Sequence, residues 1–164
     1  LYGDLAQLAA RVLAPGGSLL CYAGHYALPQ IFELMMPHLR FWWVISVGHA
    51  ESRRLPGKWV VAAWKPMLWF VKERRANNNY LRDAFSPMGA EKALHDWQQP
   101  VAEATYCIET LTEPGDLILD PMAGSGTTLI AALQTGRRAL GIEANPETVN
   151  IMRGRVSEHD YSAG

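Results

Sequence analysis

The sequence predicts an α/β fold in which a mostly parallel sheet carries helices on both faces. Unbroken apolar runs, typical of strands covered on both sides, alternate with stretches whose apolar residues recur at helical spacing. This alternation favours a parallel sheet over a sandwich or a helix bundle. The 164 residues, 49% of them hydrophobic, fit a single domain and show neither an internal repeat nor a low-complexity tract.

The first half of the chain is predicted to contain two helix and strand pairs. Residues 4–14 predict an amphipathic helix, which the Pro-Gly-Gly at 15–17 ends, and residues 18–23 form an apolar strand. Pro29 is favoured in a first helical turn and opens the second helix, and the apolar run 41–47 predicts a buried strand. The apolar face of the first helix consists of Leu5, Leu8, Ala9, Val12 and Leu13.

The second half contains a strand, a turn and a helix in direct succession. Residues 117–119 are continuously apolar, residues 127–134 carry apolar side chains at helical spacing, and residues 138–142 predict the next strand. Another amphipathic helix precedes this group, and its apolar face consists of Val101, Ala104, Ile108 and Leu111.

The turn at 120–126, Asp-Pro-Met-Ala-Gly-Ser-Gly, has the features of a cofactor loop. Gly124 and Gly126 lack a Cβ, so the backbone can turn sharply there and approach a ligand closely. A dinucleotide site would have a third glycine where Leu129 stands, and a phosphate-binding P-loop would have lysine where Thr127 stands. The aspartate at the start of the turn would repel a pyrophosphate but attract an ammonium and a sulfonium. These residues therefore favour S-adenosylmethionine.

A second acidic residue, Glu143, ends the next predicted strand, 17 residues after Gly126. In nucleotide-binding βαβ units an acid at this point accepts hydrogen bonds from ribose hydroxyls. The alternative is that Glu143 only begins a surface turn before Asn145 and Pro146, which are a good helix cap and a good first helical residue. With Asp120 and the glycine turn upstream, the ribose-binding interpretation is favoured.

Residues 120–128, followed by Gly-Ile-Glu at 141–143, resemble the cofactor motif of DNA N6-adenine and N4-cytosine methyltransferases. Met122 stands where that family usually has phenylalanine. The resemblance implies an S-adenosylmethionine-dependent, Rossmann-like methyltransferase fold, circularly permuted so that the catalytic half comes first. It also implies that the cofactor is bound by Gln99, Pro100, Asp120, Pro121, Met122, Ala123, Gly124, Ser125, Gly126, Thr127, Glu143 and Ala144.

The resemblance covers nearly the whole chain and divides one partial methyltransferase domain into three parts. Residues 1–72 correspond to the strands and helices of the catalytic half, with a terminal strand at 65–72. Residues 73–98 correspond to a target-recognition or linker region, and residues 99–164 to the cofactor-binding half. Taken alone, the first two residues of this last part are only a polar residue and a favourable first-turn proline.

The motif that performs catalysis in this family, Asp or Ser followed by Pro-Pro and an aromatic residue, does not occur in the sequence. We therefore expect an incomplete fold, a fragment whose catalytic motif and central strand lie before Leu1, and we name no catalytic residue. The strands on either side of the absent one would expose unpaired backbone groups, so the isolated fragment is expected to be inactive and poorly stable.

Basic residues gather in a loop at 53–58 and in an irregular region at 72–82 around Asn-Asn-Asn-Tyr. Asparagine can read adenine edges and tyrosine can stack on an extruded base, which suggests contact with double-stranded DNA. The alternative is an ordinary solvated loop, because a net charge of −1 lacks the basic excess typical of DNA-binding proteins. The expected DNA-binding residues are Arg53, Arg54, Lys58, Arg74, Arg75, Asn78 and Tyr80.

Other residue types carry less functional information. Cys21 and Cys107 lack the spacing of a zinc or redox motif and are expected to be buried free thiols. No apolar stretch reaches the ~20 residues of a membrane-spanning helix, so a cytoplasmic location is the default expectation. Five tryptophans in apolar stretches are expected to pack in the core or at strand edges, namely Trp42, Trp43, Trp59, Trp64 and Trp69.

The resemblance implies transfer of a methyl group from S-adenosylmethionine to the exocyclic amine of adenine or cytosine in DNA. A homodimer and a restriction enzyme are the protein partners considered. Two alternatives stay open: a methyltransferase acting on RNA or a small molecule, and a catalytically inactive nucleic-acid-binding remnant. An NAD-dependent oxidoreductase is opposed by Asp120 and by the absent third glycine.

Overall fold

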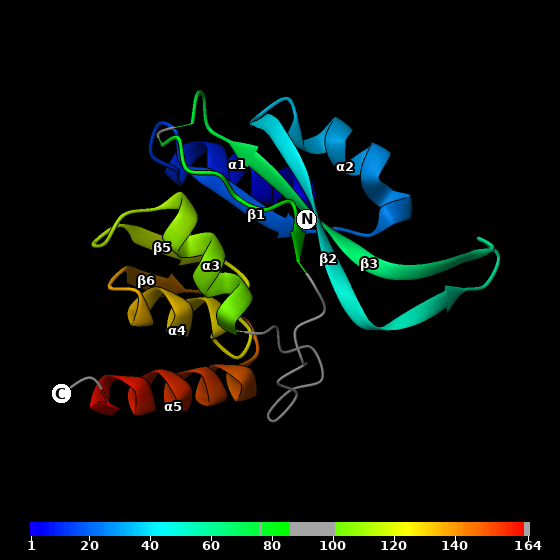
Figure 1. Ribbon diagram of the computed structural model, residues 1–164. Helices are drawn as coiled ribbons and strands as arrows, with labels where there is room; N and C mark the ends of the chain where they lie inside the picture. Colours follow the sequence, from blue (N-terminus) through cyan, green and yellow to red (C-terminus); the bar gives the residue numbers. More distant parts are fainter. Residues whose placement is uncertain (76, 86–100, 163–164) are drawn as a thin grey trace. The chain divides into compact units, whose positions relative to one another are not determined.

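The computed structural model describes residues 1–75, 77–85 and 101–162, and the chain forms two compact units, Leu1–Met88 and Gly89–Gly164 (Figure 1). Each unit combines helices with a sheet. Among the described residues, no helix is long and apolar enough to cross a membrane, and no cluster of three or more His, Cys, Asp or Glu could hold a metal ion.

The first unit contains a four-stranded sheet in the order β1-β3-β2-β4. Strands β1 (Ser18–Tyr22) and β2 (Arg40–Leu55) both run antiparallel to β3 (Val60–Val71), and the short β4 (Ala84–Phe85) runs parallel to β2. Three of the four strands therefore point in the same direction. The reversed strand lies between two of them, which makes most of the hydrogen-bonded pairs antiparallel.

Helices α1 (Tyr2–Val12) and α2 (Leu28–Met35) cover one face of this sheet, and a short 3₁₀ turn, η1 (His25–Ala27), leads into α2. The turn after α1 is tied to the end of β3, because Lys72 Nζ donates to the carbonyl of Leu13 at 2.8 Å. The Lys72 N–H also donates to the carbonyl of Gly17 at 3.0 Å. The predicted stop at the Pro-Gly-Gly sequence is confirmed.

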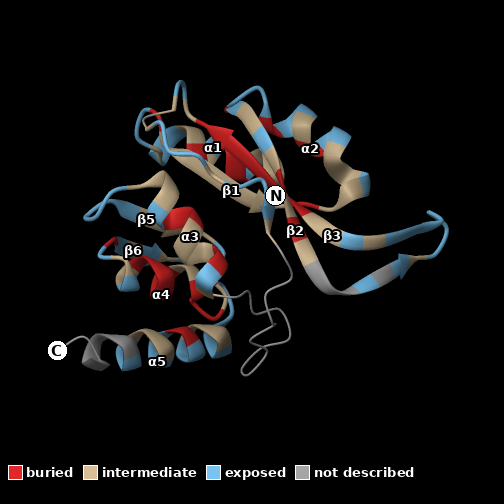
Figure 2. Ribbon diagram, viewed as in Figure 1, coloured by how far each residue is buried: buried red, intermediate tan, exposed pale blue. Residues whose placement is uncertain are grey.

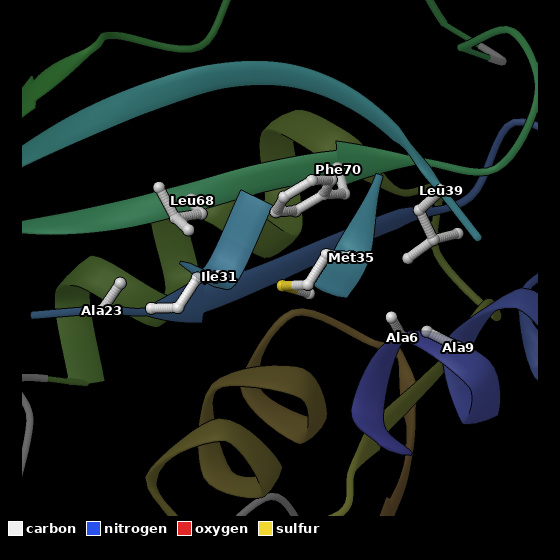
Figure 3. Close-up of a cluster of buried hydrophobic side chains, with 8 residues drawn as sticks. All are labelled: Ala6, Ala9, Ala23, Ile31, Met35, Leu39, Leu68 and Phe70. Atoms are coloured by element: carbon white, nitrogen blue, oxygen red, sulfur yellow. The ribbon is translucent and has the colours of Figure 1, made fainter. Parts of the chain in front are cut away.

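The core of the first unit lies between these two helices and the sheet. Figure 3 shows its eight buried side chains, which are Ala6, Ala9, Ala23, Ile31, Met35, Leu39, Leu68 and Phe70. The ring of Phe70 is fully buried and meets Phe41 edge-on, with ring centroids 5.7 Å apart. Burial of large apolar side chains between layers is what holds such elements together.

The second unit contains a two-stranded parallel sheet of β5 (Leu117–Asp120) and β6 (Arg138–Gly141). Helices α3 (Val101–Leu111), α4 (Thr127–Gln134) and α5 (Pro146–Ser162) accompany it. Ile118 and Ala139, which are paired across the two strands, both face the helix side, where α3, α4 and α5 pack. Within each unit the helices contact one face of the sheet. The expectation of a single sheet with helices on both faces concerns the two units together and stays a prediction.

The predicted loop at 53–58 is wrong for Arg53 and Arg54, because β2 continues to Leu55 and pairs with β3 as a long hairpin. Only Lys58 lies in the turn. The expectation that Trp59 packs in the core or at a strand edge is also wrong: it is 97% exposed, and Trp43 is 53% exposed. Runs of β-branched and aromatic residues predict strands, but they do not reveal which part of a strand extends beyond its covering helices.

Both cysteines are thiols, as expected. Cys107 is buried and Cys21 is half-buried, and burial raises the pKa of each thiol to about 12. Thiols held in the neutral form are poor nucleophiles and poor metal ligands. Their contribution is to packing.

Candidate functional site

The candidate site lies where the parallel strands β5 and β6 end side by side. Asp120 and Gly141 are register partners, so the turn after β5 and the loop after β6 begin at the same edge of the sheet. Ile142 joins the two segments, since its N–H donates to the carbonyl of Asp120 and its carbonyl accepts from the N–H of Ala123, each at 2.9 Å. Ligands of open α/β sheets bind outside the carboxyl ends of parallel strands.

The turn requires glycine at two positions. Gly124 has φ +52° and Gly126, the residue before α4, has φ +86°, a region that residues with a Cβ rarely adopt. A Cβ at Gly126 would lie 2.8 Å from Cγ of Met152 on α5, whereas a Cβ at Gly124 would meet no atom within 4 Å. Gly126 therefore permits close packing against α5, and Gly124 borders open space.

Glu143 holds the two loops together. Its Oε2 accepts from the N–H of Gly124 at 2.9 Å, and its Oε1 accepts from the N–H of Asn145 at 2.8 Å. These backbone donors, Asn145 foremost, hold the pKa of the Glu143 carboxyl below its usual value. Each carboxylate oxygen has a further lone pair, so Glu143 can support the turn and still accept a hydrogen bond from a ligand hydroxyl.

The surroundings of the two carboxylates are partly apolar. Asp120 Oδ1 accepts from the N–H of Met122 at 3.1 Å, which curls the start of the turn around the carboxylate. The side chains of Met122 and Ile142 are each 53% exposed. Two acidic groups with exposed apolar side chains beside them suit a cationic ligand that also has an apolar surface.

The helix start predicted after β6 is confirmed, while ribose binding by Glu143 stays a prediction. Asn145 caps α5, because its Oδ1 accepts from the N–H groups of Glu147 at 2.9 Å and Thr148 at 3.3 Å. Pro146 is the first residue of that helix. The predicted helix start and the turn contact of Glu143 therefore coexist, since separate groups perform them.

The other predicted cofactor residues differ in their surroundings. Ala123, Ser125 and Thr127 are buried, with Ala123 packed among Leu129 and Met152, so these three are placed to shape the loop. Pro121 is half-buried and Ala144 is exposed. Gln99 and Pro100 lie outside the described residues.

Two residues that shape the turn, Met152 and Arg155, were missed by the sequence reasoning, and Gly141 was named only as part of the resemblance. Arg155 Nη1 donates to the carbonyl of Ser125 at 2.7 Å and to its Oγ at 2.9 Å. Met152, one helical turn earlier on α5, packs against Gly126. Gly141 has no room for a Cβ, which would lie 2.8 Å from Leu129. The spacing of 152 and 155 was a signal that they share a helix face, but it did not reveal the partner of that face.

The expected DNA-binding residues fall into two groups. Arg53 and Arg54 lie near the end of β2 and Lys58 in the following turn, while Arg74, Asn78 and Tyr80 are exposed in the segment after β3. Tyr80 is 96% exposed. Their contact with DNA stays a prediction.

Arg75 differs from the others because it is used within the first unit. Its guanidinium lies 4.9 Å from the ring centroid of Trp69 and donates to the side chain of Asn77 and to the carbonyl of Asn79. Desolvation by burial lowers the pKa of Arg75. These contacts favour a role in shaping the segment that carries Tyr80.

With this geometry in view, comparison with known proteins decides the family. A family model described as DNA methylase matches residues 2–153. The chain belongs to this family of N6 and N4 DNA methylases. Type II methyltransferase M2.DpnII of Streptococcus pneumoniae is 32% identical over 109 residues, which cover 55% of this chain and 41% of the relative. M.XycI of Xanthomonas campestris pv. cyanopsidis is 46% identical over 118 residues, covering 52% and 39%.

Solved structures of similar proteins support the same assignment. A complex of M1.HpyAVI with S-adenosylmethionine has a TM-score of 0.77 and 25% identity, and the match covers 94% of this chain and 81% of that one. The cytosine-N4-specific PvuII DNA methyltransferase, with 20% identity, a TM-score of 0.77 and coverage of 93% and 68%, shows the fold alone. The expected methyltransferase fold is thus confirmed, while the chain spans less than half the length of the curated relatives named above.

Proposed function

We propose that this chain belongs to a DNA methyltransferase that moves a methyl group from S-adenosylmethionine to the exocyclic amine of adenine or cytosine. The observation that supports it best is the position of two carboxylates, Asp120 at the end of β5 and Glu143 just after the adjacent parallel strand β6. The glycine turn follows Asp120 and is bonded to Glu143, and it borders open space at Gly124.

The residues at this edge fit S-adenosylmethionine. Asp120 matches the positive charge of its ammonium and sulfonium, and Glu143 keeps acceptor capacity for ribose hydroxyls. Met122 and Ile142 offer exposed apolar surface for the adenine ring. A bound S-adenosylmethionine would supply an electrophilic methyl group, and the chain's part is to hold and orient its donor.

Duplex DNA is the proposed substrate. Tyr80 and Asn78 are exposed and available to an extruded base, and Arg75 shapes the segment that carries them. A homodimer and a cognate restriction enzyme remain proposals for protein partners, and the oligomeric state is measurable by sedimentation. A cytoplasmic location is part of the same proposal.

The deciding experiment is methyl transfer by the full-length protein from tritiated S-adenosylmethionine to unmethylated plasmid DNA, with total RNA as the competing substrate. We expect label in DNA, and mass spectrometry of the digested DNA would identify N6-methyladenine or N4-methylcytosine. Label in RNA alone would replace DNA by RNA as substrate. Absence of transfer, with DNA binding retained, would favour a binding remnant.

Replacing Arg155 by methionine is expected to weaken S-adenosylmethionine binding about tenfold, the effect of losing about 1.4 kcal/mol of interaction. Methionine keeps an apolar stem but cannot hold the carbonyl and hydroxyl of Ser125, so the turn loses its anchor to α5. Equilibrium dialysis with labelled cofactor measures the change. Arg153→Met, an exposed position on the same helix, is the matched control. Equal affinities in the two variants would contradict this role.

Cofactor binding is expected to persist as pH falls through the range where an ordinary glutamate becomes protonated. The folded-state pKa of Glu143 is lowered, so its hydrogen bonds contribute fully above the unfolded-state pKa and are lost as pH falls through the folded value. Calorimetric titration of the full-length protein between about pH 7 and pH 4 tests this. A steep loss of affinity beginning above the ordinary glutamate range would contradict it.

A further inference from the structure

The outer part of the β2–β3 hairpin, residues 48–62, is here named the hairpin arm. It extends past α1 and α2 within the first unit (Figure 1). Its tip is exposed, whereas the part of β3 near the helices is buried (Figure 2). The strands pair up to the tip, with Leu55 opposite Val60, after an irregularity in the register between Gly48 and Arg53. The arm is therefore a paired hairpin whose tip is exposed among the described residues of the first unit.

The arm extends from the edge of the sheet at which a substrate is expected to bind. It continues β2 beyond the pair Ile45 and Met67, and Met67 is also the partner of Tyr22, the last residue of β1. The tip thus projects from the carboxyl ends of the parallel strands β1 and β2. This is the sheet edge at which proteins of this architecture bind their ligands.

The tip is a tight turn that displays one aromatic side chain. Pro56 and Gly57, with φ +77° at the glycine, take the central positions of a turn that the N–H of Lys58 closes onto the carbonyl of Leu55 at 3.1 Å. Trp59 follows with φ +55° and is 97% exposed. Trp59 closes the hairpin loop in the left-handed conformation common at the end of such loops, and its indole is left unburied.

The charge of the arm favours a polyanion as the occupant. Three basic residues and one acidic residue lie within it, although the whole chain has a net charge of −1. The side chains of Arg54 and Lys58 are exposed beside Trp59. A symmetric contact between two copies of the arm would bring these like charges together, which disfavours a second copy.

We infer that the hairpin arm lies on duplex DNA beside the target base and that the Trp59 indole inserts against the bases there. The inference rests on the proposed DNA methyltransferase function. Arg54 and Lys58 neutralise phosphates, and the indole stacks on any base because every base has a π-face. A wedge that unstacks a base step also lowers the cost of extruding the neighbouring target base.

The test compares Trp59→Ala, Trp59→Gly and Trp59→Phe in the full-length protein, with unmethylated plasmid DNA and tritiated S-adenosylmethionine. We expect the KM for DNA to rise about tenfold in the alanine and glycine variants and about twofold in the phenylalanine variant, because stacking is lost or reduced. The KM for S-adenosylmethionine should not change. The glycine variant also controls for folding, since glycine suits the left-handed conformation at this position.

Leu34→Ala, at a half-exposed position on α2 away from the arm, is the matched control and should leave both KM values unchanged. A photoreactive benzoylphenylalanine at position 59 should crosslink to the plasmid DNA, and the same residue at position 34 should not. A KM for DNA within twofold of the parent for both the alanine and glycine variants would overturn the inference and leave the proposed function intact.

Two further outcomes distinguish failure of the hairpin-arm inference from failure of the proposed methyltransferase function. If Trp59→Ala changes the sedimentation of the protein while the KM for DNA stays constant, the arm joins copies of the chain and the inference is wrong. If the parent protein transfers label to no duplex DNA, the proposed function itself fails, whatever the variants do.

Discussion

Replacing Glu143 by alanine is expected to weaken S-adenosylmethionine binding about a hundredfold. The side chain accepts from the backbone of Gly124 and of Asn145, so its removal loosens the glycine turn against the loop after β6. It also removes the acceptor proposed for the ribose hydroxyls. Hydrogen bonds to a charged acceptor are stronger than those between neutral groups, and their loss together with the loosened turn accounts for this direction and size of effect.

Glu143→Gln sharpens the test because it keeps the size of the side chain. An amide oxygen can accept from one of the two backbone N–H groups, and the amide NH₂ then faces the other donor. We expect a loss of affinity close to that of the alanine variant. Calorimetric titration measures both, and Glu147→Ala, an exposed acid in the first turn of α5, is the control. Affinities of both Glu143 variants within threefold of the parent would refute this assignment.

Replacing Phe70 by alanine is expected to lower the free energy of unfolding by about 3 to 5 kcal/mol. Phe70 is fully buried on β3, and its ring meets Phe41 edge-on at 5.7 Å and lies 6.4 Å from the ring of Phe32. Alanine removes those contacts and leaves a cavity between the sheet and the helices α1 and α2, which cannot close completely around it.

Urea unfolding of the full-length protein, followed by circular dichroism, measures this change. Leu34→Ala is again a suitable control, because that side chain is 51% exposed and its truncation should cost less than about 0.5 kcal/mol. A Phe70 variant with a midpoint equal to that of the control would show that this cluster does not carry the stability of the unit.

The sequence predicted the cofactor turn well because its signals are local. An apolar run, a glycine turn and helical spacing each act over a few residues, and β5, the turn and α4 follow them closely. The acid at 143 was found for the same reason, by its distance from the turn. That its carboxylate bonds to Gly124 is a long-range contact, and only the folded chain shows it.

The hairpin shows where local signals were insufficient. Residues 41–47 and 65–72 were predicted as strands and lie largely within β2 and β3, yet nothing local indicated that β2 continues through Arg53 and Arg54. Cross-strand pairing with β3 extends it there. Trp59 was expected to pack in the core or at a strand edge because it lies in an apolar stretch, but the turn leaves its side chain exposed to solvent.

By itself, the sequence determined the α/β class, the family motif, the two carboxylates and the glycines of the turn, because backbone preferences and side-chain periodicity are written along the chain. Only the tertiary structure decided that β3 runs reversed between β1 and β2, that Arg75 is held against Trp69, and that Arg155 anchors Ser125. These features depend on residues distant in sequence meeting in space, and their partners are selected by the packing of whole elements.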